Sequence, residues 1–316
     1  MTATIRVGTR ASLLATTQAR HVADLVEARL GRPVELVEVT TEGDVNRAPL
    51  ASLGGAGVFV SALRDALLAG TVDVAVHSLK DLPTGAADGI TLAAVPLRED
   101  PRDVLVARDG LTLGGLPPGS VVATGSPRRV AQLGALGLGL EIRGIRGNID
   151  TRVGKVSSGE VDGVILARAG LARIGRLDVV TEVIDPIQML PAPGQGALAV
   201  ECRTDHPGLV ESLRGHLEDP ASRAAVDAER AVLATLEAGC SAPVGSLAEV
   251  AEGDDGLEVW VRAVALSPDG AVEIRRSASG PLAEAAEVGR RLATGMLDEG
   301  AGRLIDETPS EIGSRQ

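Results

Sequence analysis

The first two-thirds of the chain alternates short strand-like segments with helix-like ones, and few folds accommodate that order. Residues 34–40 alternate apolar and polar side chains, whereas residues 58–68 carry apolar side chains at helical spacing. The other strand-like runs are residues 72–76, 121–123, 141–145 and 161–166, and a further helix-like run is residues 128–136. This alternation is typical of α/β layers built on a largely parallel sheet.

The core of such a fold must be aliphatic here, because the chain has one phenylalanine, Phe59, one tryptophan, Trp260, and no tyrosine. With 44% hydrophobic residues over 316 positions, the chain can fill about two or three domains. Stacking of nucleic-acid bases needs aromatic platforms, so that function is close to excluded. The formal net charge of -12 also opposes phosphate backbones and anionic membranes.

Cysteine and histidine are too sparse for a disulfide framework or a zinc site, since the chain has Cys202, Cys240 and four histidines. The first ten residues lack an apolar run of signal-peptide length, and no stretch approaches a membrane span. We therefore expect a soluble, cytoplasmic protein that binds no metal, no nucleic acid and no membrane.

Two proline-containing stretches look like crossings between domains. Residues 96–101 combine charge with proline, and residues 191–196 read PAPGQG, which cannot continue a helix. Residues 197–202 then look like one more strand. If that strand returns to the first sheet, two lobes share two crossover segments with a cleft between them, where ligands bind outside the carboxyl ends of the strands.

The last third of the chain has a different pattern. Residues 222–238 predict an amphipathic helix, and Gly239 sits where a C-cap glycine belongs. Residues 257–266 and 272–277 predict antiparallel strands, and residues 282–297 predict a closing helix, so this part is a small α+β domain. The predicted domains are residues 1–97 with 197–217, residues 102–191, and residues 219–316.

Positive charge is concentrated in residues 121–155, where six cations stand against Glu141 and Asp150, a balance of +4 in a chain of -12. The six are Arg128, Arg129, Arg143, Arg146, Arg152 and Lys155. Ser126 and Pro127 favour a helix start that places Arg128 and Arg129 in the first turn, where free amides favour an anion. A solvated face of surface ion pairs is the alternative.

Two further segments combine a strand end with polar residues. Arg10 and Ser12 follow the strand-like residues 5–8, so Ser12 can cap the helical run to Leu30 while Arg10 faces an anion. From these residues alone, an ordinary capped helix is the favoured alternative. Lys80 and Asp81 follow the strand that ends near Val76. Lys80 offers a positive charge and Asp81 a carboxylate for an N–H group or a developing cation, unless they form a simple loop ion pair.

The two cysteines and His77 have different expected environments. Cys240 lies in a loop with a flanking glycine and serine, but the preceding helix C-terminus raises a thiol pKa, so activation needs cations from elsewhere. An incidental cysteine is the alternative. Cys202 is expected to be packed in the core, and His77 to be buried and hydrogen-bonded.

Seven segments, in order over nearly the whole chain, resemble those of the porphobilinogen deaminase family. They are TRASLLA (9–15), DVAVHSLKDLP (73–83), REDPRD (98–103), GSPRR (125–129), RGNIDTR (146–152), PGQG (193–196) and GCSAPVGS (239–246). The resemblance implies two lobes like those of periplasmic binding proteins and a third domain that carries the cofactor loop. It also implies a monomeric transferase of porphyrin and heme biosynthesis.

The resemblance further implies a dipyrromethane cofactor in thioether linkage to Cys240. Four porphobilinogen molecules would condense on it, with loss of ammonia at each step, to give hydroxymethylbilane. Asp81 matches the catalytic carboxylate. The cofactor would be bound by Ser12, Lys80, Ser126, Arg128, Arg129 and Arg146. The substrate would be bound by Arg10, Arg152, Arg173 and Gln195.

The chain departs from the family pattern at three places. Ala56 stands where a lysine is common, which lowers the charge of a glycine-rich loop. Glu237, Ala238 and Gly239 replace a frequent Glu-Gly-Gly, and Arg168 stands where an apolar residue is usual. The sequence gives no account of Arg168.

Two other classes of protein remain as alternatives. A two-lobed solute receptor or effector-sensing domain would explain the cleft and the arginines, but it would not need Cys240 or a third domain. A thiol enzyme would use Cys240 as a transient nucleophile and predicts a free thiol at rest, whereas the deaminase predicts a permanently alkylated one.

Overall fold

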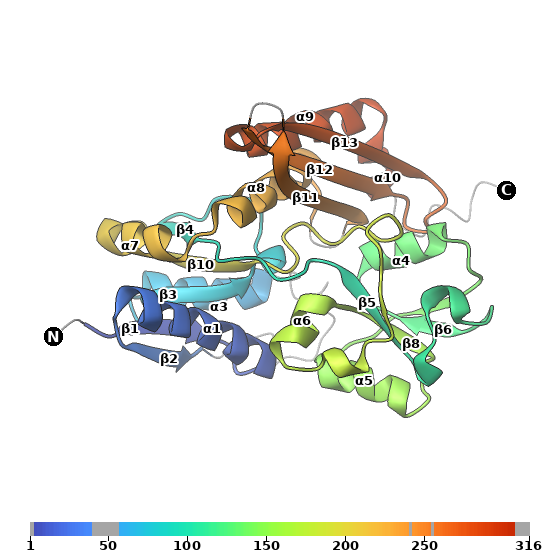
Figure 1. The fold of residues 1–316 in the computed structure, drawn as a ribbon, viewed down its shortest axis with the longest axis horizontal. Coiled ribbons are helices and arrows are strands. Elements are labelled where there is room, and N and C mark those ends of the chain that lie inside the picture. The colour runs from blue at the N-terminus through green and yellow to red at the C-terminus, as the bar shows by residue number, and fades with distance from the viewer. Residues whose placement is uncertain (1–2, 40–56, 240–241, 254–255, 307–316) are drawn as a thin grey trace. The chain divides into compact units, whose positions relative to one another are not determined.

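Buried aliphatic runs form three sheets in the computed structural model, which describes residues 3–39, 57–239, 242–253 and 256–306, with backbone alone at 57–59 (Figure 1). The chain forms two compact units, called here the first and second unit. The first comprises Met1–Glu99 and Gly196–Arg223, and the second Asp100–Gln195 and Ala224–Gln316. The chain therefore passes between units within both proline-containing stretches.

The first unit contains a five-stranded sheet in which the first strand pairs in parallel with its two neighbours. In spatial order the strands are β2 (Val34–Glu38), β1 (Ile5–Thr9), β3 (Val74–Ser78), β10 (Leu198–Arg203) and β4 (Ile90–Ala94). Strand β10 runs antiparallel to both β3 and β4. The expected strand at residues 197–202 therefore corresponds to β10 and lies in the first sheet.

Helices cover both faces of this sheet, because successive side chains of a strand point to opposite faces. Val74 and Val76 of β3 pack in the cluster with α1 (Leu13–Leu30) and α7 (Pro207–Leu217). Ala75 instead packs in the cluster with α3 (Gly57–Leu68). Double-sided cover explains why strands such as β10 are buried almost throughout.

The second unit repeats this strand pattern in its own five-stranded sheet. In spatial order the strands are β7 (Glu141–Arg143), β6 (Val121–Ala123), β8 (Gly163–Ala167), β5 (Asp103–Ala107) and β9 (Glu182–Val183). Helices α5 (Ile149–Ser157) and α6 (Arg168–Arg173) pack in the cluster on one face, and α4 (Pro127–Ala135) in the cluster on the other.

The expectation of a largely parallel sheet is wrong in one respect. Each five-stranded sheet has two parallel pairings and two antiparallel ones. The reason is the exchange of chain between the units, which brings β10 and β5 into their sheets from the opposite direction. Strands β4 and β5 were not predicted, because they flank the charged, proline-containing residues 96–101, which were interpreted only as a crossing between domains.

The C-terminal part of the second unit is a three-stranded antiparallel sheet with helices on one face. Its elements are β11 (Val244–Gly253), β12 (Gly256–Leu266), β13 (Glu273–Pro281), α8 (Pro220–Thr235), α9 (Ala285–Asp298) and α10 (Ala301–Asp306). The predicted small α+β domain is therefore present, with β11 as an unpredicted third strand. Its core is aliphatic, from Ala228 and Val232 of α8 to Val259 and Val261 of β12.

The end of α8 differs from the prediction at Gly239. The residue in the left-handed conformation is Glu237, with φ 51°. Its position lets Ala238 N–H donate to Leu233 O at 3.1 Å and Glu237 N–H to Ala234 O at 3.1 Å, which closes the helix. Closure therefore occurs two residues before Gly239.

Helix α4 packs directly on the turn between β12 and β13. A Cβ atom on Gly134 would lie 2.4 Å from Asp269 O, and one on Gly270 would lie 2.1 Å from Ala131 O. Two backbones approach this closely only where glycine occupies the contact. Buried Leu190, Val264 and Leu266 extend the contact. Among the described helices, none is both long and apolar enough to span a bilayer.

Candidate active site

Four predicted site residues lie at one edge of the first sheet. Strands β1 and β3 are parallel neighbours, so their carboxyl ends share an edge. Arg10 and Ser12 follow β1, and Lys80 and Asp81 follow β3 in a short 3₁₀ turn, Leu79–Asp81. The sheet therefore places these four residues at one edge.

Local hydrogen bonds fix this edge. The Ser12 side chain accepts from Ala15 N–H at 3.3 Å, so the predicted cap of α1 is confirmed. Gln18 Nε2 donates to Ser78 Oγ at 2.9 Å, which ties α1 to the end of β3. Lys80 is half-buried and Asp81 is exposed, so the carboxylate is open to a ligand.

A buried charged residue that the sequence did not predict lies on β10, the strand that pairs with β3. Glu201 of β10 is 3% exposed and accepts from Arg64 of α3 at 3.0 and 2.7 Å. His77 Nε2 lies 3.2 Å from Glu201 Oε2. His77 and Cys202 are both buried, as predicted. A glutamate within an otherwise apolar strand was the sequence signal that could have revealed this buried ion pair.

The second sheet places the predicted arginines at its corresponding edge. Its parallel strands β6, β7 and β8 end there, and antiparallel β5 begins there, because Asp103 pairs with Ala167. Ser126, Arg128 and Arg129 follow β6, Arg146 follows β7, and Arg168 follows β8. These cations thus share one edge within the second unit.

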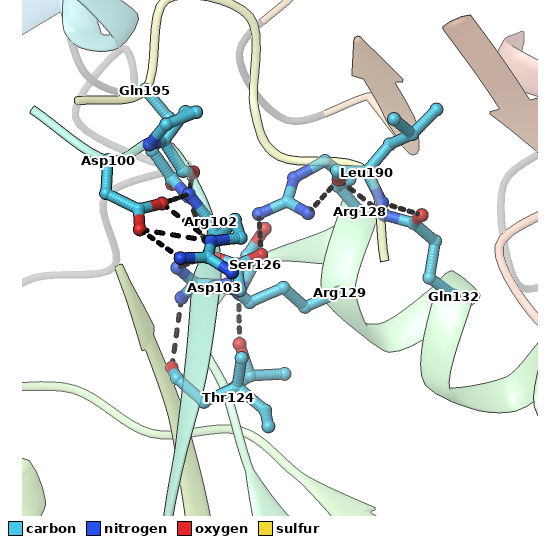
Figure 2. Close-up of polar contacts among 12 residues, drawn as sticks. Asp100, Arg102, Asp103, Thr124, Ser126, Arg128, Arg129, Gln132, Leu190 and Gln195 are labelled. Carbon is cyan, nitrogen blue, oxygen red and sulfur yellow. Dashed lines mark hydrogen bonds and ion pairs between the residues drawn. The ribbon is translucent and has the colours of Figure 1, made fainter. Parts of the chain in front are cut away.

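The centre of this edge is Asp103, which is fully buried (Figure 2). Arg128 Nη2 donates to Asp103 Oδ2 at 2.7 Å, and Arg129 Nη2 donates to Oδ1 at 2.8 Å. Gln195 Nε2 donates to the same Oδ1 at 2.7 Å and to Pro101 O at 2.7 Å. Three predicted site residues therefore donate hydrogen bonds to one carboxylate. Asp103 belongs to the REDPRD segment (98–103), but the sequence predicted no role for it.

Both arginines are held at a second point. Arg128 Nη1 donates to Leu190 O, and Arg129 Nη1 donates to Ile165 O at 3.0 Å. Gln132, one turn further along α4, exchanges hydrogen bonds with the backbone of Leu190 at 2.9 and 2.8 Å. Arg128 and Arg129 are 3% and 6% exposed, so neither is a solvated surface cation.

The cluster stays ionised despite its burial. Burial raises the pKa of Asp103, but the charges of Arg128 and Arg129 and the hydrogen bonds from Arg129 and Gln195 hold that pKa far below its usual value. Burial lowers the pKa of Arg128, yet an arginine keeps its proton in proteins. One carboxylate therefore stands among two permanent cations.

The other predicted site residues of the second unit differ in their exposure and contacts. Arg152 is half-buried, and burial followed by the charge of Arg129 lowers its pKa. Its Nε donates to Gly147 O at 2.8 Å. Arg146 is exposed and Arg173 is half-buried at the end of α6. Ser126 occupies the N-cap position of α4, but its side chain makes no capping hydrogen bond.

Arg168, for which the sequence gave no account, lies in an ion-pair cluster. Its Nε is 3.4 Å from Asp100 Oδ2, and Arg102 binds the same carboxylate through Nη2 at 2.6 Å. Cys240 and Ala56 lie outside the described residues, so their predicted roles are untested. Among the described residues, no three metal-ligating side chains are grouped as an ion site.

The fold and this edge together define a class: a mixed α/β protein with buried arginines gathered at one sheet edge of the second unit. Residues 5–211 match the profile of the porphobilinogen deaminase dipyrromethane cofactor binding domain, and residues 224–298 match the porphobilinogen deaminase C-terminal domain. The chain belongs to the porphobilinogen deaminase family, and it is a transferase with a dipyrromethane cofactor.

Curated relatives cover almost the whole chain. This chain is 58% identical over 306 residues to the porphobilinogen deaminase of Mycobacterium tuberculosis. The aligned region covers 95% of this chain and 98% of that protein. The chain is 56% identical over 317 residues to that of Nocardia farcinica, spanning 98% of this chain and 91% of that protein.

Two solved structures that resemble this chain in fold share little sequence with it. One is a putative methionine-binding lipoprotein of Bacillus subtilis, with 12% identity and a TM-score of 0.42, over 68% of this chain and 90% of that one. Another is a periplasmic substrate-binding protein of Coxiella burnetii, with 16% identity and a TM-score of 0.42, over 69% and 94%.

The residues present fit a dipyrromethane group. Each of its pyrrole rings carries an acetate and a propionate, which are hydrogen-bond acceptors. Arg128 Nε and Arg129 Nε are buried and have no hydrogen-bond partner among the described residues. An unpaired buried N–H costs about 1–3 kcal/mol, so two donors of this kind match carboxylate acceptors of a ligand.

Proposed function

We propose that this chain is a hydroxymethylbilane synthase that joins four porphobilinogen molecules, with release of ammonia at each step. Its dipyrromethane cofactor is held by a thioether to Cys240. One observation carries the proposal: in a chain of net charge -12, two buried guanidinium groups keep N–H donors unpaired. We further propose that the enzyme acts as a monomer in the cytoplasm and binds neither nucleic acid nor membranes.

The arginines bind carboxylates and orient the rings. Each added porphobilinogen brings two carboxylates, so a growing chain needs several guanidinium groups. Arg128, Arg129 and Arg146, with Ser126, are assigned to the cofactor, and Arg152 and Arg173 to incoming substrate. Arginine suits this role because its planar fork matches a carboxylate bidentately.

The first unit supplies the acid–base group. When bound, the cofactor supplies the nucleophilic α-carbon that starts the chain. Loss of ammonia from porphobilinogen leaves an electrophilic carbon, and after the new carbon–carbon bond forms, the attacking ring loses the proton of its α-carbon. Asp81 accepts a hydrogen bond from the pyrrole N–H, stabilises positive charge on that nitrogen and takes up the proton lost from the α-carbon. Lys80, Ser12 and Arg10 bind carboxylates beside it.

The test is the intact mass of the denatured protein, measured together with porphobilinogen consumption. The proposal expects a mass excess of two pyrrole units that Cys240→Ser abolishes along with turnover. Cys202→Ala is the matched control, because Cys202 is a buried core residue and should leave the mass excess in place.

Other outcomes identify other functions. A wild-type protein without added mass and without turnover would support a two-lobed anion-binding protein. A free, alkylatable Cys240 thiol in an active protein would support a thiol enzyme.

A further inference from the structure

Asp103 contacts Arg128 and Arg129, the arginines assigned to the cofactor, through their terminal nitrogens. It lies at the first position of β5, opposite Ala167 of β8, and has no exposed surface. Its two oxygens are divided, with Oδ2 accepting from Arg128 and Oδ1 from Arg129 and Gln195. The carboxylate is therefore fully occupied by the protein's own donors and is not placed to take part in the reaction.

Each guanidinium group is fixed at two terminal nitrogens. For Arg128 the acceptors are Leu190 O and Asp103 Oδ2, and for Arg129 they are Ile165 O and Asp103 Oδ1. Two acceptors on different nitrogens determine the plane of a guanidinium group. The Nε donors, which have no partner among the described residues, then point in a direction that these acceptors set.

The charges of the three residues also favour a role for Asp103 in holding the two arginines in place. Without Asp103, two buried guanidinium groups on adjacent residues would repel each other with no counter-ion in contact. With it, the cluster retains one positive charge. That excess remains available to a carboxylate of a ligand.

We propose that Asp103 is the positioning residue that aims the guanidinium groups of Arg128 and Arg129 at the cofactor carboxylates. This inference rests on the proposed function, which assigns those arginines to the cofactor. Asp103 acts through the arginines and touches neither cofactor nor substrate. Gln195 contributes by holding Oδ1 in place from the opposite side.

Positioning and plain stability make different predictions. Partners behind metal ligands are worth about 10- to 100-fold in affinity, and we expect a similar effect here. A purely structural Asp103 would lower stability but leave cofactor occupancy of the folded protein unchanged. Glu229 offers the matched comparison, since it is also a fully buried carboxylate of the second unit and accepts from Gly194 N–H and Ala248 N–H at 2.6 and 2.7 Å.

The experiment compares Asp103→Asn, Asp103→Glu and Glu229→Gln with the wild type. For each purified holoenzyme, intact mass gives the fraction carrying cofactor, thermal unfolding gives stability, and kinetics give KM and kcat. All are measured below the lowest unfolding temperature. We expect Asp103→Asn to lower occupancy or raise KM about tenfold, and Glu229→Gln to change both less than about twofold at similar stability.

Asp103→Glu keeps the test decisive if Asp103→Asn does not fold. It retains the charge but shifts it by one methylene, so it should show the same loss in a smaller degree. Wild-type occupancy and KM in the folded Asp103 variants, or an equal loss in Glu229→Gln, would overturn the inference. A wild-type protein without the mass excess would instead refute the proposed function.

Discussion

Glu201 accepts both donors of the Arg64 fork, with Arg64 Nε 3.0 Å from Oε2 and Nη2 2.7 Å from Oε1. The pair joins α3 to β10, the antiparallel strand of the first sheet. Because β10 pairs with β3, the strand that leads into Lys80 and Asp81, the ion pair stabilises the frame of the first unit.

Replacing Glu201 by Gln should reduce stability in a pH-dependent way. Burial raises the pKa of Glu201, but hydrogen bonds and charge from His77 and Arg64 lower it further, to about 2 from the usual 4.5. A depressed folded-state pKa adds stability above pH 4.5, at most about 3 kcal/mol, which is lost as pH falls toward 2. Urea unfolding at several pH values should show the gap between wild type and Glu201→Gln narrowing below pH 4.5. A gap independent of pH would contradict this assignment.

Gly270→Ala should destabilise the second unit strongly. Its φ is +76°, and an added Cβ would meet backbone atoms of Ala131 and Ala135 at 2.1 and 2.6 Å, which cannot move without displacing α4. We expect a loss of about 3 kcal/mol, from strain and overpacking together. Gly137→Ala is the control, since its φ is +63° with nothing within 4 Å, and about 1 kcal/mol is expected there. Denaturant unfolding measures both, and equal losses would show that the contact carries no weight.

Two serines at helix starts should differ when each is changed to alanine. Ser12 caps α1 through its side chain, so Ser12→Ala should cost about 1 kcal/mol. Ser126 makes no capping hydrogen bond, so Ser126→Ala should change stability by less than about 0.5 kcal/mol. Thermal unfolding of the two variants in parallel tests this, and the reverse order would be inconsistent with the hydrogen bonds.

Asp81→Asn should lower kcat about 100-fold or more while leaving the fold and the mass excess intact, because an amide cannot take up a proton. Asp88→Asn is the control, since Asp88 is likewise exposed in the first unit. Steady-state turnover with a parallel intact-mass measurement gives the answer. Near-normal turnover in Asp81→Asn would remove Asp81 from the mechanism.

Local signals in the sequence predicted most of the elements that position the site. Ser12 at a helix start, the apolar spacing of residues 58–68 and the β-branched run around Val74 each act over a few residues, and the corresponding helices and strand are present. The departures are also local. The turn at Glu237 took the left-handed conformation because helix α8 ends at Thr235, earlier than its apolar pattern suggested.

The sequence by itself determined that this chain makes mixed α/β layers with an aliphatic core and gathers arginines near strand ends in an acidic protein. Composition and short-range periodicity carry that information. Only the tertiary structure decided that Asp103, 25 and 26 positions before Arg128 and Arg129, would neutralise part of their charge and fix their direction. The physical reason is that a buried ion pair depends on which strands become neighbours, and the antiparallel entry of β5 beside β8 is set by the path of the chain through both units.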